Sequence, residues 1–76
     1  NPAKQDLNIV IELNEMENIS IEIYNLVGKL ISENNYNLNT GSNRINLILD
    51  NLDEGSYLCR IKTNSGILSK NFNIIK

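Results

Sequence analysis

The side chains that usually perform chemistry are scarce in this 76-residue chain. It contains no His and one cysteine, Cys59, so it cannot assemble a Cys/His zinc site or a His-activated nucleophile. It also lacks a Gly-rich phosphate loop and paired carboxylates in an identifiable pocket. We therefore expect no enzyme, no metal and no cofactor. Cys59 is interpreted as a buried, reduced thiol, with pairing between molecules as the alternative.

Acidic residues near the first turn are the remaining candidates for a ligand site. Glu12, Glu15, Glu17 and Glu22 lie close together in the sequence. They lack the ordered Asp, Asn and Gly spacing of a calcium loop. We interpret them as a solvated, charged loop.

The charge balance excludes several classes of partner. Seven Lys and Arg against nine Asp and Glu give a net charge of −2, and no basic run is present. Nucleic-acid binding needs clustered basic side chains, so we do not expect it. No apolar run approaches the ~20 residues of a membrane helix. The chain opens with Asn1-Pro2 rather than Met, which suggests a piece of a longer protein.

Side-chain alternation with a period of two predicts strands along most of the chain. Aliphatic residues at every second position mark segments 7–13, 19–24, 45–50, 57–63 and 68–74, and a weaker strand is expected over 29–33. Turns are expected at 25–28, 51–55 and 64–66, the last ending at Gly66. The polar segment 34–43 is interpreted as a longer connection that includes a short edge strand. Six or seven short strands predict one all-β domain, an antiparallel β-sandwich.

The inward positions of this alternation define the predicted core. Burial of each apolar side chain contributes roughly 1.5–3 kcal/mol. The predicted core residues are Leu7, Ile9, Ile11, Ile19, Ile21, Ile23, Ile45, Leu47, Leu49, Tyr57, Ile61, Phe72 and Ile74.

A tyrosine after the predicted turn at 51–55 suggests a specific tertiary contact. Leu52 and Gly55 precede Tyr57 at the start of a strand. In Greek-key sandwiches a tyrosine so placed folds its ring into the core and returns its hydroxyl to the backbone upstream. The alternative is an ordinary strand tyrosine after a turn.

Four motifs together resemble a known family. The chain opens with Asn1-Pro2-Ala3 and continues with Ile21-Glu22-Ile23-Tyr24-Asn25-Leu26-Val27-Gly28-Lys29, Leu52-Asp53-Glu54-Gly55-Ser56-Tyr57 and Ser69-Lys70-Asn71-Phe72-Asn73-Ile74-Ile75-Lys76. Their order and spacing resemble the C-terminal sorting domain of the type IX (Por) secretion system, over essentially all 76 residues. Cys59 stands where the family usually has an aliphatic residue.

This resemblance implies a fold and a role. It implies an immunoglobulin-like sandwich of about seven short strands, attached to an N-terminal cargo protein of a Gram-negative bacterium. The outer-membrane translocon and its shuttle proteins would recognise the domain and deliver the cargo to the cell surface. A sortase-like surface peptidase would then remove the domain.

The family motifs also assign candidate roles to individual residues. Asn1, Pro2, Gly28, Leu52, Gly55, Tyr57 and Gly66 are expected to be structural. The last strand is the candidate recognition segment, with its two Lys side chains outside, because a sheet edge accepts a partner strand. The recognition residues are Lys70, Phe72, Ile74 and Lys76. Solvated lysines that merely protect the edge from pairing are the alternative.

Two other functions stay open from the sequence alone. One is a fibronectin-type or carbohydrate-binding accessory module, for which Tyr24 and Tyr36 are the candidate stacking residues. The other is a structural adhesin repeat, which requires neighbouring copies in the parent protein.

Overall fold

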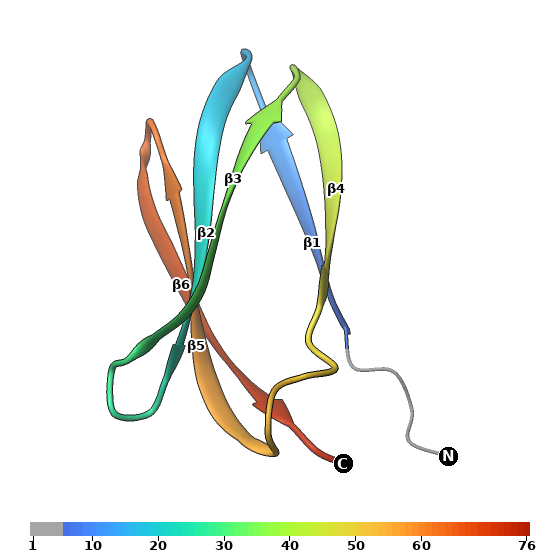
Figure 1. Ribbon diagram of the computed structural model, residues 1–76. Coiled ribbons are helices and arrows are strands. Elements are labelled where there is room, and N and C mark those ends of the chain that lie inside the picture. Colours follow the sequence, from blue (N-terminus) through green and yellow to red (C-terminus); the bar gives the residue numbers. More distant parts are fainter. Residues whose placement is uncertain (1–5) are drawn as a thin grey trace.

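The alternating aliphatic segments form six strands and no helix in the computed structural model, which describes residues 6–76. Figure 1 shows the strands in chain order. They are β1 (Asp6–Leu13), β2 (Glu17–Asn25), β3 (Leu30–Leu38), β4 (Gly41–Ile48), β5 (Gly55–Thr63) and β6 (Gly66–Ile74).

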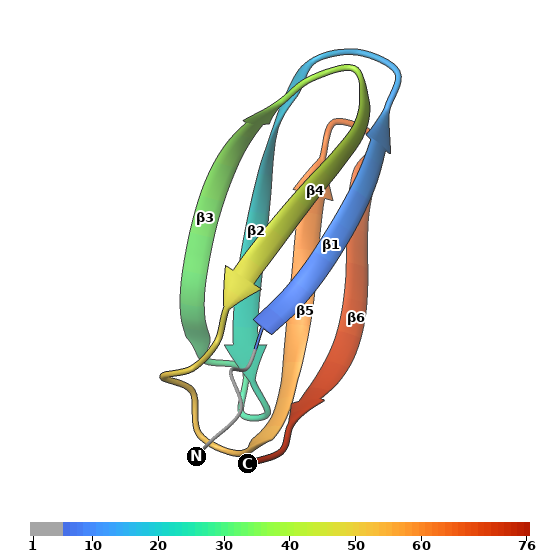
Figure 2. The ribbon, with the colours of Figure 1, turned by 90° about the vertical axis from the view of Figure 1, so that its right-hand side faces the viewer.

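The strands are divided between two sheets that face each other. One sheet has two strands, in the order β1-β4, and the other has four, in the order β3-β2-β5-β6. Every neighbouring pair is antiparallel. Figure 2 shows the smaller sheet lying across the larger one. The predicted all-β sandwich is confirmed, with six strands instead of about seven.

The core lies between the sheets and is mostly aliphatic. Eight of the predicted core residues are buried: Ile19, Ile21, Ile23, Ile45, Leu47, Leu49, Tyr57 and Ile74. The other five, Leu7, Ile9, Ile11, Ile61 and Phe72, are partly buried against them. Cys59 completes the buried set with an exposed fraction of 4%. The three isoleucines of the central strand β2 and Ile74 of β6 are the best covered, each at most 2% exposed.

Strand β3 differs from the prediction. The sequence suggested a weak strand over 29–33 followed by a connection, whereas β3 continues without a break from Leu30 to Leu38. It is an edge strand, so its many amide side chains can face water while its backbone pairs with β2. Tyr36 and Leu38 still pack against the core. Because most side chains of β3 are polar, the alternation of apolar and polar residues predicted only parts of this strand.

Asparagine side chains shape two of the turns. At the β2–β3 turn, the Asn25 side chain accepts hydrogen bonds from the Val27 and Lys29 N–H groups at 3.1 and 2.9 Å. Gly28 closes this turn with a φ of +87°, a conformation that only glycine adopts at no steric cost. Asn43 stabilises the connection from β3 to β4 in a similar way, because its side-chain amide donates to the Asn39 carbonyl at 2.8 Å. The predicted turn at Gly28 is confirmed.

Candidate recognition surface

Strand β6 is paired on one side only among the described residues. Its partner is β5, and the turn between them consists of residues 64 and 65, with Thr63 opposite Gly66. Across such a short turn the flanking residues form a hydrogen-bonded pair, and every second pair along the ladder does the same. The backbone groups that point away from β5 therefore belong to Ile67, Ser69, Asn71 and Asn73.

The side chains of β6 alternate between the two faces of the sheet. Leu68 pairs with Ile61, Lys70 with Cys59 and Phe72 with Tyr57, so these three side chains face the smaller sheet. Ile74 lies on the same face and is 2% exposed, whereas Leu68 is 67% exposed. Three predicted recognition residues, Lys70, Phe72 and Ile74, thus share the inward face, so the prediction that the Lys70 side chain lies outside is wrong. Coverage of this face is high at Ile74 and low at Leu68.

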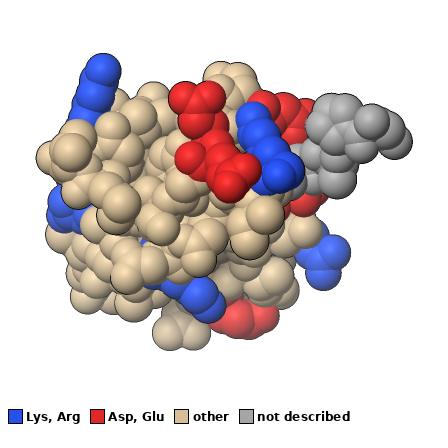
Figure 3. Space-filling view, turned by 90° about the horizontal axis from the view of Figure 1, so that it is seen from below, with Lys and Arg blue, Asp and Glu red and all other residues tan. Residues whose placement is uncertain are grey.

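Lys76 lies apart from the other candidate recognition residues. Its Nζ donates to the Asp50 carbonyl at 3.2 Å, and its backbone N–H donates to the Glu54 carboxylate at 3.4 Å. Figure 3, viewed from this end of the sandwich, shows acidic side chains beside a basic one on a largely uncharged surface. The Lys76 side chain is therefore fastened to the β4–β5 connection, and it does not form a joint basic site with Lys70.

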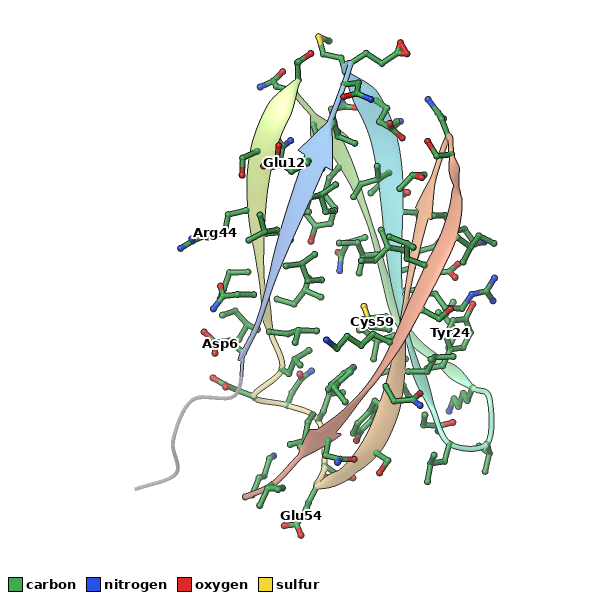
Figure 4. All side chains as sticks on the ribbon, turned by 180° about the vertical axis from the view of Figure 1, so that it is seen from behind. Asp6, Glu12, Tyr24, Arg44, Glu54 and Cys59 are labelled. Atoms are coloured by element: carbon green, nitrogen blue, oxygen red, sulfur yellow. The ribbon has the colours of Figure 1, made fainter. Side chains whose placement is uncertain are left out.

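A recess of about 300 Å³ opens between β1 and β6. It is lined by Leu7, Asn8, Ile9, Val10, Cys59, Ile61, Lys70 and Phe72. Figure 4 shows Cys59 pointing into the space between the sheets. Burial raises the pKa of its thiol, and the predicted burial of Cys59 is confirmed. The side chain of Lys70 makes no hydrogen bond or ion pair with any described residue.

Tyr57 closes the corner between the β4–β5 connection and β5. The residue is 8% exposed, and its hydroxyl donates to the Asp53 carbonyl at 2.7 Å. The ring stacks on Phe72 with 5.7 Å between centroids. Leu52 packs against the core nearby, and Gly55 begins β5. The predicted tyrosine corner is confirmed, and it fixes the start of β5 against the last strand.

The outer face of the larger sheet carries a polar cluster that the sequence analysis missed. Glu22 is only 5% exposed, so its assignment to a solvated loop is wrong. Its carboxylate accepts a hydrogen bond from the Tyr24 hydroxyl at 2.9 Å and pairs with Lys62 at 3.3 Å. Glu22 and Tyr24 are two residues apart in a clearly predicted strand, so the sequence could have shown that their side chains lie on the same face of the sheet.

This cluster shifts two pKa values in opposite directions. The hydrogen bond from Tyr24 is the main reason that the pKa of Glu22 lies below its ordinary value, and Lys62 adds to the effect. The same hydrogen bond raises the pKa of Tyr24. Arg60 lies over the Tyr24 ring at 5.7 Å from its centroid. The Glu22 carboxylate is thus paired with Lys62, and this contact links β2 to β5.

The aromatic side chains do not form a sugar-binding platform. The Arg60 guanidinium covers Tyr24, and Tyr36 packs against the core. Sugar stacking needs exposed rings, so the accessory-module alternative has no support here. Within residues 6–76, no group of His, Cys, Asp and Glu side chains is placed to hold a metal ion. No helix formed by these residues is long and apolar enough to cross a membrane.

Comparison with protein families gives a match over the whole chain. Residues 1–76 match the family described as the secretion system C-terminal sorting domain. No curated protein and no solved structure matches the chain. The family match includes Asn1 and Pro2, which lie outside the described residues.

Proposed function

The chain belongs to the family of secretion system C-terminal sorting domains, and from this premise we propose that the last strand is the part that the export machinery recognises. Members of this family are sorting signals of type IX secretion, which direct a cargo protein N-terminal to them through the outer membrane to the cell surface. In our proposal the translocon and its shuttle proteins recognise the segment from Leu68 to Lys76.

Two exposed side chains on the inner face of β6, Leu68 and Lys70, support this proposal most directly. Leu68 faces the smaller sheet but is 67% exposed, and Lys70 on the same face has no partner among the described residues. In an isolated domain an inward-facing leucine normally finds a covering layer, because burying its side chain contributes roughly 1.5–3 kcal/mol. An aliphatic and a cationic side chain beside an unpaired backbone edge are suited to binding another protein.

We further propose that the domain performs no catalysis and is itself a substrate. The one thiol is buried and has a raised pKa, which opposes nucleophilic chemistry. In this proposal the domain acts only as a sorting signal, and a sortase-like surface peptidase removes it after transport. Such removal requires cleavage on the N-terminal side of the sandwich.

A reporter fusion in a bacterium with a type IX system tests the recognition proposal. A reporter that carries the domain should reach the cell surface, and the same reporter without it should stay in the periplasm. Lys70→Glu should reduce surface display, whereas Lys29→Glu, the same charge change in the β2–β3 turn, should not. Equal display of both variants would overturn recognition through β6. Urea unfolding of each variant shows whether folding was preserved.

A further inference from the structure

The outer face of the larger sheet contains a hollow of about 400 Å³ beside the β2–β3 turn. A volume of this size lies within the range of ligand-binding pockets. Figure 1 shows the β2–β3 turn leaning away from the smaller sheet, and Figure 4 shows Tyr24 on the same side of the molecule. Among residues 6–76, Arg60 is the only charged residue that lines the hollow. The lining also includes Tyr24, Asn25, Leu26, Leu58 and Asn71.

The positive charge of Arg60 is not balanced within this hollow. The nearby Glu22 carboxylate already accepts the hydrogen bond from Tyr24 at 2.9 Å and pairs with Lys62 at 3.3 Å. Glu33 lies on the other side of Glu22 from Arg60 and does not line the hollow. Arg60 makes no hydrogen bond or ion pair with any described residue. Its N–H groups are therefore available to a ligand.

The contact with Tyr24 fixes the guanidinium without occupying those N–H groups. The Arg60 Cζ atom lies 5.7 Å from the centre of the ring, and the ring is held in turn by its hydroxyl hydrogen bond to Glu22. A guanidinium over an aromatic ring keeps its donors at its rim, where two of them can bind a planar carboxylate in parallel. Arg44, the other arginine of the chain, is exposed on β4 and lies over no ring.

The β2–β3 turn adds an apolar wall that is held in place. The Asn25 side chain accepts hydrogen bonds from the Val27 and Lys29 N–H groups, and its backbone carbonyl accepts one from Gly28. Leu26 and Val27 are 81% and 87% exposed in this fixed turn, but only Leu26 lines the hollow. The three N–H groups are engaged inside the turn, so they are not free to bind the carboxylate of a chain end.

From this geometry we infer that the hollow binds an acidic side chain of another protein, flanked by aliphatic residues. The carboxylate pairs with the Arg60 guanidinium, and the flanking side chains cover Leu26 and Leu58. A phosphate group carries a charge of about −1.5 to −2, which one guanidinium does not balance, so a carboxylate is the better match. The hollow lies on the opposite face of the larger sheet from Lys70, so this inference goes beyond the proposed recognition through β6.

A short blocked peptide tests the site directly. The probe has glutamate at its centre, leucine on each side and glycine at both ends, and its twin has the uncharged glutamine in place of the glutamate. In an NMR titration the glutamate peptide should cause saturable shifts at Arg60 and Leu26. It should bind at least about fivefold more tightly than the twin, because charge-assisted hydrogen bonds are about twice as strong as neutral ones. No saturable shift, or equal affinity of the twin, would overturn the inference.

Two matched pairs of variants locate the contacts. Arg60→Gln should abolish the preference for glutamate, whereas Arg44→Gln, which removes the same charge from β4, should preserve it. Leu26→Ser should weaken binding of the glutamate peptide at least about threefold, whereas Val27→Ser in the same turn should not. Urea unfolding shows that each variant is folded. Equal effects within either pair would contradict the site as described.

Inorganic phosphate distinguishes the two anion chemistries. At the same concentration as the glutamate peptide, it should leave the peptide bound. Displacement of the peptide under these conditions would assign the hollow to a phosphate group and overturn the assignment to a carboxylate. These titrations need no secretion system, so they are independent of the reporter assay. A domain that exports the reporter but binds neither peptide refutes this site and leaves the sorting function intact.

Discussion

Replacement of Tyr57 by Phe isolates the hydrogen bond that fixes the corner of the sandwich. The ring stays buried against Phe72, and only the hydroxyl that donates to the Asp53 carbonyl at 2.7 Å is removed. A hydrogen bond of this kind contributes about 0.5–1.5 kcal/mol net to the free energy of unfolding. Asp53 is exposed, so water can hydrate its freed carbonyl and the additional cost of an unpaired group is avoided. We expect a loss of about 1 kcal/mol.

This loss is large for so small a domain. A chain of 76 residues has an expected stability of roughly 4–11 kcal/mol. For domains of this size, 1 kcal/mol lowers the melting temperature by about 4–8 °C. With a urea slope near 1 kcal/mol per molar, the midpoint falls by about 1 M. Urea unfolding followed by circular dichroism resolves a change of this size.

The structure offers a matched control in Tyr36. Its ring also packs against the core, but its hydroxyl has no hydrogen-bond partner among residues 6–76. Tyr36→Phe should change stability by less than about 0.5 kcal/mol. If Tyr57→Phe and Tyr36→Phe have the same midpoint and slope, the corner hydrogen bond does not stabilise the fold, and our explanation of the β4–β5 corner fails.

Three further predictions concern packing, charge and backbone conformation. Ile21→Ala, at a side chain with 0% exposure, should cost about 2–5 kcal/mol in urea unfolding, whereas Val10→Ala on the outer face should cost less than about 0.5 kcal/mol. Because folding lowers the pKa of Glu22 from its ordinary value, its stabilising contribution is complete above the pKa of the unfolded chain and disappears as the pH falls through the folded value. Glu22→Gln should therefore weaken the dependence of the urea midpoint on acid pH, and an unchanged acid limb would contradict this. Gly28→Ala should cost about 1–2 kcal/mol because of its positive φ, although no atom lies within 4 Å of the added Cβ; Gly28→Asn should cost less, and equal losses would point to another cause.

The alternation of side chains predicted the central part of the fold. The isoleucines of β2 lie in the core between the two sheets, so one face of the strand is apolar and its period of two is clear in the sequence. The Tyr57 corner was also predictable, because it depends on a turn only four residues upstream. Such short-range relations between burial, turns and side-chain type can be deduced from local sequence.

Features set by distant pairings were not predictable in the same way. Strand β3 tolerates a run of polar side chains because its outer edge is exposed, and its position is fixed by pairing with β2. Glu22 forms its ion pair with Lys62, forty residues later in the chain, because β5 pairs with β2 and places Lys62 opposite Ser20. No local pattern reveals that pairing.

The recess depends on a long-range relation of the same kind. Lys70 and Phe72 alternate as in any amphipathic strand, and the sequence places them correctly on one face. Whether that face is covered depends on how far β1 and β4 extend across the larger sheet, and their pairing joins residues about forty positions apart. A domain with a full second layer would bury Leu68 and lose the free inner face of β6. The two-stranded sheet covers the buried side chains of β2 and β5 and leaves Leu68 exposed.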